Sequence, residues 1–303
     1  MNNYNEIIRK LQNEIVTTQK GLVQAESLER LKDIAKVYAG EDEVVSFEEI
    51  AEKIKNQGEE FVIMSGWEKL DAILKGFRLQ QLIVVSAATK SGKTTMLMDL
   101  TTKIAEHNPI WFPFEESAEE LIRKFIETNR EPPKAFTPKS LKGSSVEWIE
   151  SKIVEAIAKY NTKVVFIDQL DFIIPYSSDN HSLRIGQAMR ELKSLAKKWN
   201  VVIFIICHLV KTRMESQPTL EDLRGSSAIG QEADTVLLLW RESKKEDGQM
   251  VITDNVNLSV QANRRTGKTG NIKMIYVGGR FIEENWVSQT EKQKDVDRDF
   301  NNY

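Results

Sequence analysis

Residues 81–95 read QLIVVSAATKSGKTT, and this stretch decides the fold class. Its first part, Gln81 to Ser86, is an apolar run typical of a buried strand, and the residues from Lys93 onward carry apolar side chains at helical spacing. The segment from Ala87 to Thr95 fits the phosphate-loop pattern, except that alanine stands where the pattern opens with glycine. A chance GKT in an ordinary loop is the alternative, and the flanking strand and helix argue against it.

The loop contains the residue types that phosphate binding needs. Gly92 permits a tight backbone path, so that successive N–H groups can surround phosphate oxygens, and the start of the following helix adds its positive dipole end. Lys93 can reach the β- and γ-phosphates of ATP, and the hydroxyl of Thr94 can bind Mg²⁺. The predicted nucleotide-binding residues are Ala87, Ala88, Thr89, Lys90, Ser91, Gly92, Lys93, Thr94 and Thr95.

Outside this stretch the chain alternates strand-like and helix-like segments. Helical spacing predicts helices at Val146 to Tyr160 and at Ser182 to Trp199. Strands that are apolar almost throughout and alternate with helices indicate an α/β fold with a largely parallel sheet covered on both faces. Such sheets bind ligands at the carboxyl ends of their strands. Further strands are expected at Ile110 to Phe114, Lys163 to Asp168, Val201 to His208, Asp234 to Trp240, Asn257 to Ala262 and Ile272 to Val277.

A carboxylate at the end of a second buried strand is the next requirement, because Mg²⁺ at a triphosphate is held with the help of an acidic residue. The segment KVVFID ends on Asp168, which we predict to be that residue. A lone aspartate after a strand is often only a turn former, so this assignment depends on the phosphate loop.

Hydrolysis also needs a carboxylate that polarises the attacking water. The residue after Asp168 is Gln169, which cannot accept a proton. Glu115 is the predicted base, because it follows a strand and precedes a helix with the capping sequence SAEE. A solvated carboxylate near a helix N-terminus is the alternative reading of Glu115. Asp171 is the fallback base.

His208 ends the predicted strand of residues 201–208, on the edge where the phosphates are expected. A histidine satisfied by its neighbours is the ordinary explanation for such a residue. The functional explanation is a γ-phosphate sensor, whose hydrogen bond depends on whether ATP or ADP is bound. Its place on the same edge favours the sensor.

Composition places the chain among ordinary globular proteins. It has 303 residues, of which 41% are hydrophobic and 29% charged, and it contains no apolar run long enough to span a bilayer and no secretory segment at its start. Its single cysteine, Cys207, excludes a disulfide scaffold and a cysteine-rich zinc site. We therefore expect a cytoplasmic protein.

Charge and pattern divide the chain into three parts. Residues 1–60 hold 8 Lys and Arg against 13 Asp and Glu, and the rest of the chain is nearly neutral. The chain therefore has no extended basic surface for nucleic acid, and any contact with nucleic acid must be local. Residues 1–60 read as helices, with a predicted cap at Ser46 and Glu49, whose apolar stripes must cover the main domain or another subunit. Residues 61–287 form the α/β domain, and residues 288–303 read as a polar, disordered tail.

Together these motifs resemble the DnaB-type hexameric replicative helicases, including the helicase half of phage primase-helicases. The resemblance runs through SGWEKLDAILKGFRLQQLIVVSAATKSGKTT, WFPFEESAEEL, VVFIDQLDFI, ICHLVK, DLRGSSAIGQEAD and the ANRRTGKTG region. Alanine at the opening of the phosphate loop is usual in that family. The resemblance implies a ring of RecA-like P-loop domains with ATP between subunits. The residues that match the family's site are Lys93, Thr94, Glu115, Asp168 and His208.

The resemblance also implies an arginine that reaches the γ-phosphate from the neighbouring subunit. Alignment with the phage relatives places it at Arg264, whereas the bacterial spacing places it at Arg265. In a strand the two side chains point to opposite faces, so that one of them is expected to reach the phosphate, and we favour Arg264. The family's lysine two residues earlier is replaced by Ala262 or Asn263, which weakens the expected contact. Two solvated charges at a strand end are the alternative.

Loops that face a central channel supply the DNA contacts of this family. The matching segments are Pro175 to Arg184 and Lys211 to Ser227, whose basic and small residues suit sequence-independent binding of a single strand. A flexible polar loop is the alternative. The predicted DNA-binding residues are Lys211, Arg213, Arg224, Gly225, Ser226 and Ser227.

The predicted function is that of an ATP-dependent DNA helicase that assembles as a homo-oligomeric, hexameric ring and translocates on single-stranded DNA during replication, in a bacterial or phage-infected cell. A RecA-like recombinase and a non-unwinding DNA-dependent ATPase are the alternatives. Residues 1–60 match only the family's linker helices, which pack on the adjacent subunit. Coupling to a primase is then either absent or supplied by another protein, so a separate primase or helicase loader is one expected kind of partner.

Overall fold

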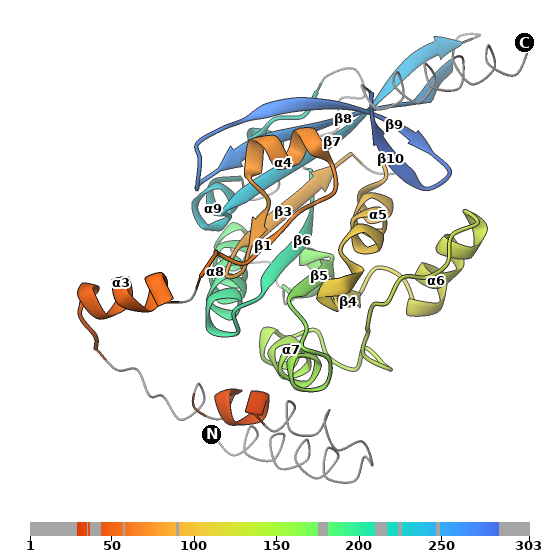
Figure 1. Ribbon diagram of the computed structural model, residues 1–303. Helices are drawn as coiled ribbons and strands as arrows, with labels where there is room; N and C mark the ends of the chain where they lie inside the picture. The colour runs from red at the N-terminus through yellow and green to blue at the C-terminus, as the bar shows by residue number, and fades with distance from the viewer. Residues whose placement is uncertain are drawn as a thin grey trace, which may run out of the picture.

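The computed structural model describes residues 29–34, 36, 44–56, 58–88, 91–174, 181–209, 217–223, 226–246 and 249–284. The strands of its central sheet are β3 (Leu82–Ala87), β4 (Ile110–Pro113), β5 (Val164–Asp168), β6 (Val202–His208), β7 (Thr235–Glu246), β8 (Gln249–Asn263), β9 (Gly270–Val277) and β10 (Arg280–Glu283). Their spatial order is β10-β9-β8-β7-β3-β6-β5-β4 (Figure 1). A separate short pair joins β1 (Val62–Ile63) to β2 (Phe77–Arg78).

The predicted largely parallel sheet is confirmed, with an antiparallel extension at one side. Strand β3 lies parallel to β6 and β7, and β5 lies parallel to β4 and β6. Strands β8, β9 and β10 follow as antiparallel neighbours. Short connections explain this, because a parallel neighbour needs a crossover of about a dozen residues. The β9–β10 turn, for example, consists of Gly278 and Gly279, with φ of 53° and 80°.

Helices cover both faces of the sheet (Figure 1). The helix predicted at residues 146–160 is confirmed with those bounds, and the helix predicted at residues 182–199 is confirmed with a shift of one residue. None of the described helices is both long and apolar enough to span a membrane. The helices of the α/β domain are α4 (Glu68–Leu74), α5 (Lys93–Lys103), α6 (Ala118–Glu127), α7 (Val146–Tyr160), α8 (His181–Lys198) and α9 (Ser226–Glu232).

Strand β3 shows how the two faces are built. Side chains of a strand alternate between its faces, and Leu82 and Val84 belong to one hydrophobic core whereas Ile83 and Val85 belong to the other. Helices α7 and α8 contribute to the first core, and α4, α5 and α6 contribute to the second. Burial on both faces is the reason why the strand sequence is apolar throughout.

The N-terminal helical segments behave in two different ways. Residues 29–34 are helical and pack on the main domain, where Leu31 and Ile34 are buried in the first core. Helix α3 (Phe47–Asn56) has no buried residue, and Phe47 is 91% exposed. The predicted cap is present, since the hydroxyl of Ser46 accepts the N–H of Glu49 at 3.1 Å. The described residues therefore cover one apolar stripe and leave the other uncovered.

Candidate functional site

The phosphate loop joins β3 to α5 at the carboxyl edge of the parallel strands. Gly92 is the N-cap of α5 and has a φ of 92°, a left-handed conformation that favours glycine. Ser91 N donates to the carbonyl of Ala88 at 3.1 Å, which turns the chain into the helix. Thr89 and Lys90, which belong to the predicted loop, lie outside the described residues. The described part has the strand, turn and helix order that phosphate binding requires.

Lys93 points back over the start of the loop. Its Nζ donates to the carbonyl oxygens of Ala87 and Ala88 at 3.3 and 3.4 Å, and the residue is 8% exposed. Burial lowers the pKa of Lys93, while the carboxylates of Glu115 and Asp168 act in the opposite direction. A buried ammonium group therefore faces two acidic side chains at the mouth of the loop.

Thr94 and Asp168 meet although they are far apart in the chain. Thr94 Oγ1 donates to Oδ2 of Asp168 at 2.7 Å, and Asp168 is 1% exposed at the end of β5. The other carboxylate oxygen, Oδ1, is buried and has no hydrogen-bond partner. A hydroxyl and a partly free carboxylate are hard oxygen donors, which fit Mg²⁺. The described residues contain no cluster of three His, Cys, Asp or Glu side chains, and Mg²⁺ ordinarily completes its shell with water and phosphate.

The pKa of Asp168 gives a testable pH dependence. Burial raises this pKa from 3.8 to about 6, with Glu115 and Glu116 adding to the shift and the Thr94 hydrogen bond opposing it. Folding thus disfavours the charged form, so the contribution of Asp168 to the free energy of unfolding falls as pH rises through these values. Relative to Asp168→Asn, the unliganded wild-type chain should lose on the order of 1 kcal/mol of stability between about pH 5 and pH 7. Urea unfolding of both chains across that range tests this, and parallel pH profiles would contradict it.

Glu115 lies directly beside Asp168. Pro113 pairs with Asp168 in the sheet, and the N–H groups of Phe114 and Glu115 both donate to the Asp168 carbonyl, at 2.7 and 3.1 Å. The Glu115 side chain is exposed on this edge. The next residue, Glu116, is instead paired with Lys124 of α6. Of the two neighbouring carboxylates, Glu115 is therefore the one that is exposed to solvent.

The helix after Glu115 begins as the sequence predicts. Ser117 and Glu120 form a capping box, in which the hydroxyl accepts the N–H of Glu120 and the carboxylate accepts the N–H of Ser117. The fallback base, Asp171, lies in the short helical turn Leu170–Phe172. Its carboxylate adds to the effect of burial in raising the pKa of Cys207 in β6. Asp171 is therefore on the β6 side of Asp168, whereas Glu115 is on the β4 side.

His208 lies next to the phosphate loop. It ends β6 and pairs with Ala87, the last residue of β3, so that β6 separates the phosphate-loop strand from the Asp168 strand. Its side chain is half-buried. The structure thus brings the phosphate loop, Asp168, Glu115 and His208 together on one edge.

The two predicted arginines are on the opposite edge. Strand β8 runs antiparallel to β7, and its last residue Asn263 pairs with Thr235 at the start of β7, whereas Ala87 pairs with Leu239. Thr235 and Leu239 are four residues apart along β7, which corresponds to about 13 Å. An arginine at this level is far from the phosphate loop of its own chain.

The expectation that Arg264 and Arg265 lie in a strand is wrong. Strand β8 ends at Asn263, and residues 264–266 form a turn, here called the arginine turn. The amide of Asn263 donates to Thr266 Oγ1 at 2.6 Å, and Gly267 N donates to the Asn263 carbonyl at 2.9 Å, which closes the turn. The alternation of a strand therefore does not decide which arginine faces a neighbour.

Most of the predicted DNA-binding residues lie outside the described residues, namely Lys211, Arg213, Arg224 and Gly225. The expectation that Ser226 and Ser227 belong to the loop is wrong, because they form the first turn of α9. Leu209 and Leu223 form an isolated bridge, which brings together the two ends of the intervening segment. This segment leaves the sheet at the end of β6, on the edge of the phosphate loop. Of Pro175 to Arg184, residues 181–184 belong to α8 and residues 175–180 are not described.

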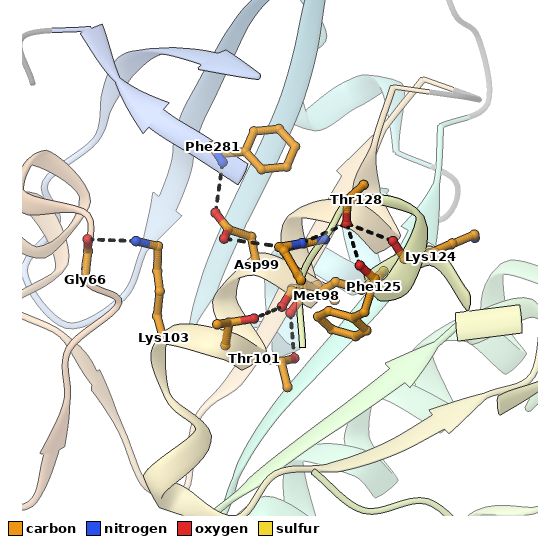
Figure 2. Close-up of polar contacts among 12 residues, drawn as sticks. Gly66, Met98, Asp99, Thr101, Lys103, Lys124, Phe125, Thr128 and Phe281 are labelled. Atoms are coloured by element: carbon orange, nitrogen blue, oxygen red, sulfur yellow. Dashed lines mark hydrogen bonds and ion pairs between the residues drawn. The ribbon is translucent and has the colours of Figure 1, made fainter. Parts of the chain in front are cut away.

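A buried polar layer along α5 was not predicted. Asp99 accepts the N–H of Phe281 at 2.9 Å (Figure 2). It also pairs with Arg130 at 3.8 Å. Burial raises the pKa of Asp99, while the Phe281 N–H and nearby cations oppose the shift. A cavity of 280 Å³ opens beside Asp99 and Lys103. The signal was an aspartate within the apolar run Met96 to Leu100, and the layer connects α5 with β10 and with the chain after α6.

Fold and site together define the class of protein. A phosphate loop after β3, an acidic residue at the end of a strand one position removed, and a carboxylate beside it are the arrangement of a RecA-like P-loop nucleoside triphosphatase. Family comparison agrees: the profile described as "DnaB-like helicase C terminal domain" matches residues 62–144 and 135–281. The chain belongs to this family.

The chain is also similar to individual curated proteins. The chain is 27% identical over 294 residues to the "Replicative DNA helicase DnaB" of Mycoplasma genitalium, covering 82% of this chain and 61% of the relative. It is 25% identical over 258 residues to the "Probable replicative DNA helicase" of Trieres chinensis, covering 71% of this chain and 55% of the relative. The chain thus spans little more than half the length of these curated relatives.

Two solved structures share the fold. The "ATPase Domain of G40P" superposes with a TM-score of 0.67 at 20% identity, covering 79% of this chain and 99% of that one. A structure titled "The Structure Of A DnaB-Like Replicative Helicase And Its Interactions With Primase" also has a TM-score of 0.67, at 19% identity, covering 91% of this chain and 76% of that one.

Proposed function

We propose that the protein is an ATP-driven DNA helicase, which forms a ring and translocates on single-stranded DNA. One observation carries the proposal: the phosphate loop, Asp168 and Glu115 share one edge of the sheet, while the arginine turn lies on the other. A site completed by an arginine must then take that arginine from a neighbouring copy. Such an arrangement couples each hydrolysis event to the contact between two subunits.

The site residues divide the chemistry among them. Residues 87–95 surround the phosphates of ATP, and Lys93 supplies a positive charge to the β- and γ-phosphates. Thr94 and Asp168 would hold Mg²⁺, which would supply positive charge to the phosphate oxygens. Glu115 orients and polarises the attacking water, and His208 responds to the γ-phosphate. Arg264 stabilises transition-state charge in trans, where such an arginine contributes roughly 10³- to 10⁵-fold to the rate.

The trans role of Arg264 predicts complementation between two inactive chains. Arg264→Ala lacks the arginine but has an intact phosphate loop, and Lys93→Ala lacks the loop charge but can donate its arginine. Mixed assemblies contain interfaces with an intact loop on one side and an intact arginine on the other. We expect ATP turnover of the mixture to exceed that of both separate chains, in a steady-state assay with single-stranded DNA.

The same mixing experiment with Arg265→Ala is the matched control. That chain should keep most of its own activity if Arg264 is the finger. Absence of recovery at every mixing ratio of the Arg264→Ala and Lys93→Ala chains would contradict a trans role for Arg264.

Residues 1–60 serve as a linker in subunit packing under this proposal, followed by the ATPase domain of residues 61–287 and the tail of residues 288–303. The support is helix α3, on which Phe47, Ile50 and Ile54 are 91%, 41% and 61% exposed. An apolar stripe of this kind is expected to find cover on another subunit. The helical residues 29–34, in contrast, already pack on their own domain.

DNA binding is assigned to the segment that follows β6, with Lys211, Arg213, Arg224 and Gly225, and to Ser226 and Ser227 in the first turn of α9. In a ring of six copies these loops face one channel, so their basic residues are concentrated there. A chain with a net charge of −3 can then bind DNA locally. Strand displacement on a forked duplex separates a helicase from a non-unwinding ATPase. Electron microscopy distinguishes a helicase, which is expected to form rings, from a strand-exchange protein, which is expected to form helical filaments.

A further inference from the structure

Glu60 lies between α3 and the α/β domain, and its carboxylate contacts two arginines. Its Oε2 is 2.7 Å from Nε of Arg78 and 3.1 Å from Nη2 of Arg265. Arg78 is itself held on another side, because its Nη1 donates to the carbonyl oxygens of Lys75 and Gly76 at 3.0 and 3.3 Å. One carboxylate oxygen therefore links a fixed arginine of β2 to the arginine turn.

Helix α4 anchors the arginine turn at Thr266. Thr266 Oγ1 donates to the carbonyl of Ile73 at 3.4 Å and accepts the N–H of Lys268 at 3.1 Å. Gly270, at the start of β9, lies against the side chain of Ile73, where a Cβ would come within 3.0 Å of it. Arg264 and Arg265 precede this anchor in the chain.

The two side chains have acceptors of different strength. Nη2 of Arg264 donates to the neutral carbonyl of Gln231, whereas Nη2 of Arg265 donates to the carboxylate of Glu60. Hydrogen bonds to a charged acceptor are about twice as strong as those to a neutral one. Arg264 is therefore the side chain that leaves its own subunit more readily, and Arg265 is the one that stays.

Glu60 also separates like charges. Arg78 and Arg265 both contact the same oxygen atom, so their guanidinium groups are close neighbours with a negative charge between them. Without that charge the two cations repel each other, and Arg78 is the better held of the two. Arg265 is therefore the side chain that is pushed away, and it displaces the part of the arginine turn before Thr266.

We propose that Glu60 is a positioning residue for Arg264: by screening Arg265 from the charge of Arg78, it keeps in place the turn that presents Arg264 to the nucleotide of the adjacent subunit. This inference rests on the proposed function, in which Arg264 acts in trans. Arg265 is then not the finger, and its charge is accommodated because the carboxylate of Glu60 lies beside it. Because Glu60 follows α3 after a few residues, the same contact ties the N-terminal segment to the position of the finger.

The test compares Glu60→Gln, Arg265→Gln and the double variant in the full chain, by DNA-stimulated ATP turnover. Glu60→Gln should lower kcat roughly fivefold and leave KM for ATP within about twofold, since the residue touches no nucleotide of its own site. Adding Arg265→Gln should raise kcat again, because a neutral side chain removes the repulsion from Arg78. Glu59→Gln removes the same charge one residue earlier and should turn over ATP like the wild type.

Further variants keep the result decisive. Arg265→Lys retains a cation for Glu60 and should stay active, whereas Arg264→Lys should lose most of its turnover because lysine lacks the planar fork. The proposal is overturned if Arg265→Lys is as inactive as Arg264→Lys, or if the double variant is no better than Glu60→Gln. A rise in KM at unchanged kcat in Glu60→Gln also overturns it. The proposed function is tested by a different experiment: it fails if the Arg264→Ala and Lys93→Ala chains do not complement each other.

Discussion

Replacing Lys93 with alanine is expected to reduce ATP turnover by roughly 10³-fold or more, the scale of losing a preorganised charge contact in a transition state. Nζ of Lys93 lies 3.3 Å from the carbonyl of Ala87, inside the loop that is proposed to surround the phosphates. Burial lowers its pKa, but the carboxylates of Glu115 and Asp168 support the charged form. A steady-state ATPase assay with single-stranded DNA, combined with nucleotide-binding measurements, checks this result.

Lys103→Ala is the matched control for Lys93→Ala. Lys103 belongs to the last turn of the same helix, and its Nζ donates to the carbonyl of Gly66 at 3.4 Å. Its removal deletes the same charge from α5 without touching the phosphate loop, so turnover should stay within about threefold of wild type. Retained turnover in Lys93→Ala would remove the phosphate-loop assignment.

Glu115→Gln is expected to bind ATP with near wild-type affinity and to hydrolyse it roughly 10²- to 10⁴-fold more slowly, the range that general acid–base catalysis contributes. The amide keeps the size of the side chain and its backbone hydrogen bond to Asp168, while it can no longer polarise water. The variant should therefore accumulate bound ATP. Single-turnover hydrolysis and equilibrium binding of a fluorescent ATP analogue separate the two effects.

Glu116→Gln controls for the loss of a neighbouring negative charge. Glu116 is paired with Lys124 and also contributes to the raised pKa of Asp168. Its replacement should alter turnover far less than that of Glu115, because its carboxylate is engaged with α6 and does not face the mouth of the loop. Loss of nucleotide binding in Glu115→Gln would show that Glu115 is structural.

Features that depend on neighbouring residues were predictable from the sequence. The phosphate loop, the Ser117–Glu120 capping box and the helix at residues 146–160 each follow from residues within a few turns or one loop of one another. The end of β5 at Asp168 was predictable for a similar reason, since an apolar run stops there at an acidic residue.

Features that depend on distant segments were not predictable in the same way. The two residues of β1 and of β2 are too short to show a period, and β10 follows a two-glycine turn that could equally end a strand. The pairing of Asp99 with Arg130 and Phe281 joins segments that are far apart in the chain. The resemblance to a known family suggested two arginines, but a strand pattern could not show that β8 ends before them.

By itself the sequence determined the α/β class, and it predicted the phosphate loop with Thr94, the Asp168 carboxylate and Glu115 as site residues, because local spacing and residue chemistry are enough for each. Only the tertiary structure decided that Thr94 and Asp168 are in contact, that Glu116 is engaged while Glu115 is exposed, and that the arginine turn lies on the far edge of the sheet. The physical reason is strand order and direction. Parallel strands bring their carboxyl ends to one edge, and the antiparallel return of β8 carries Arg264 and Arg265 to the other.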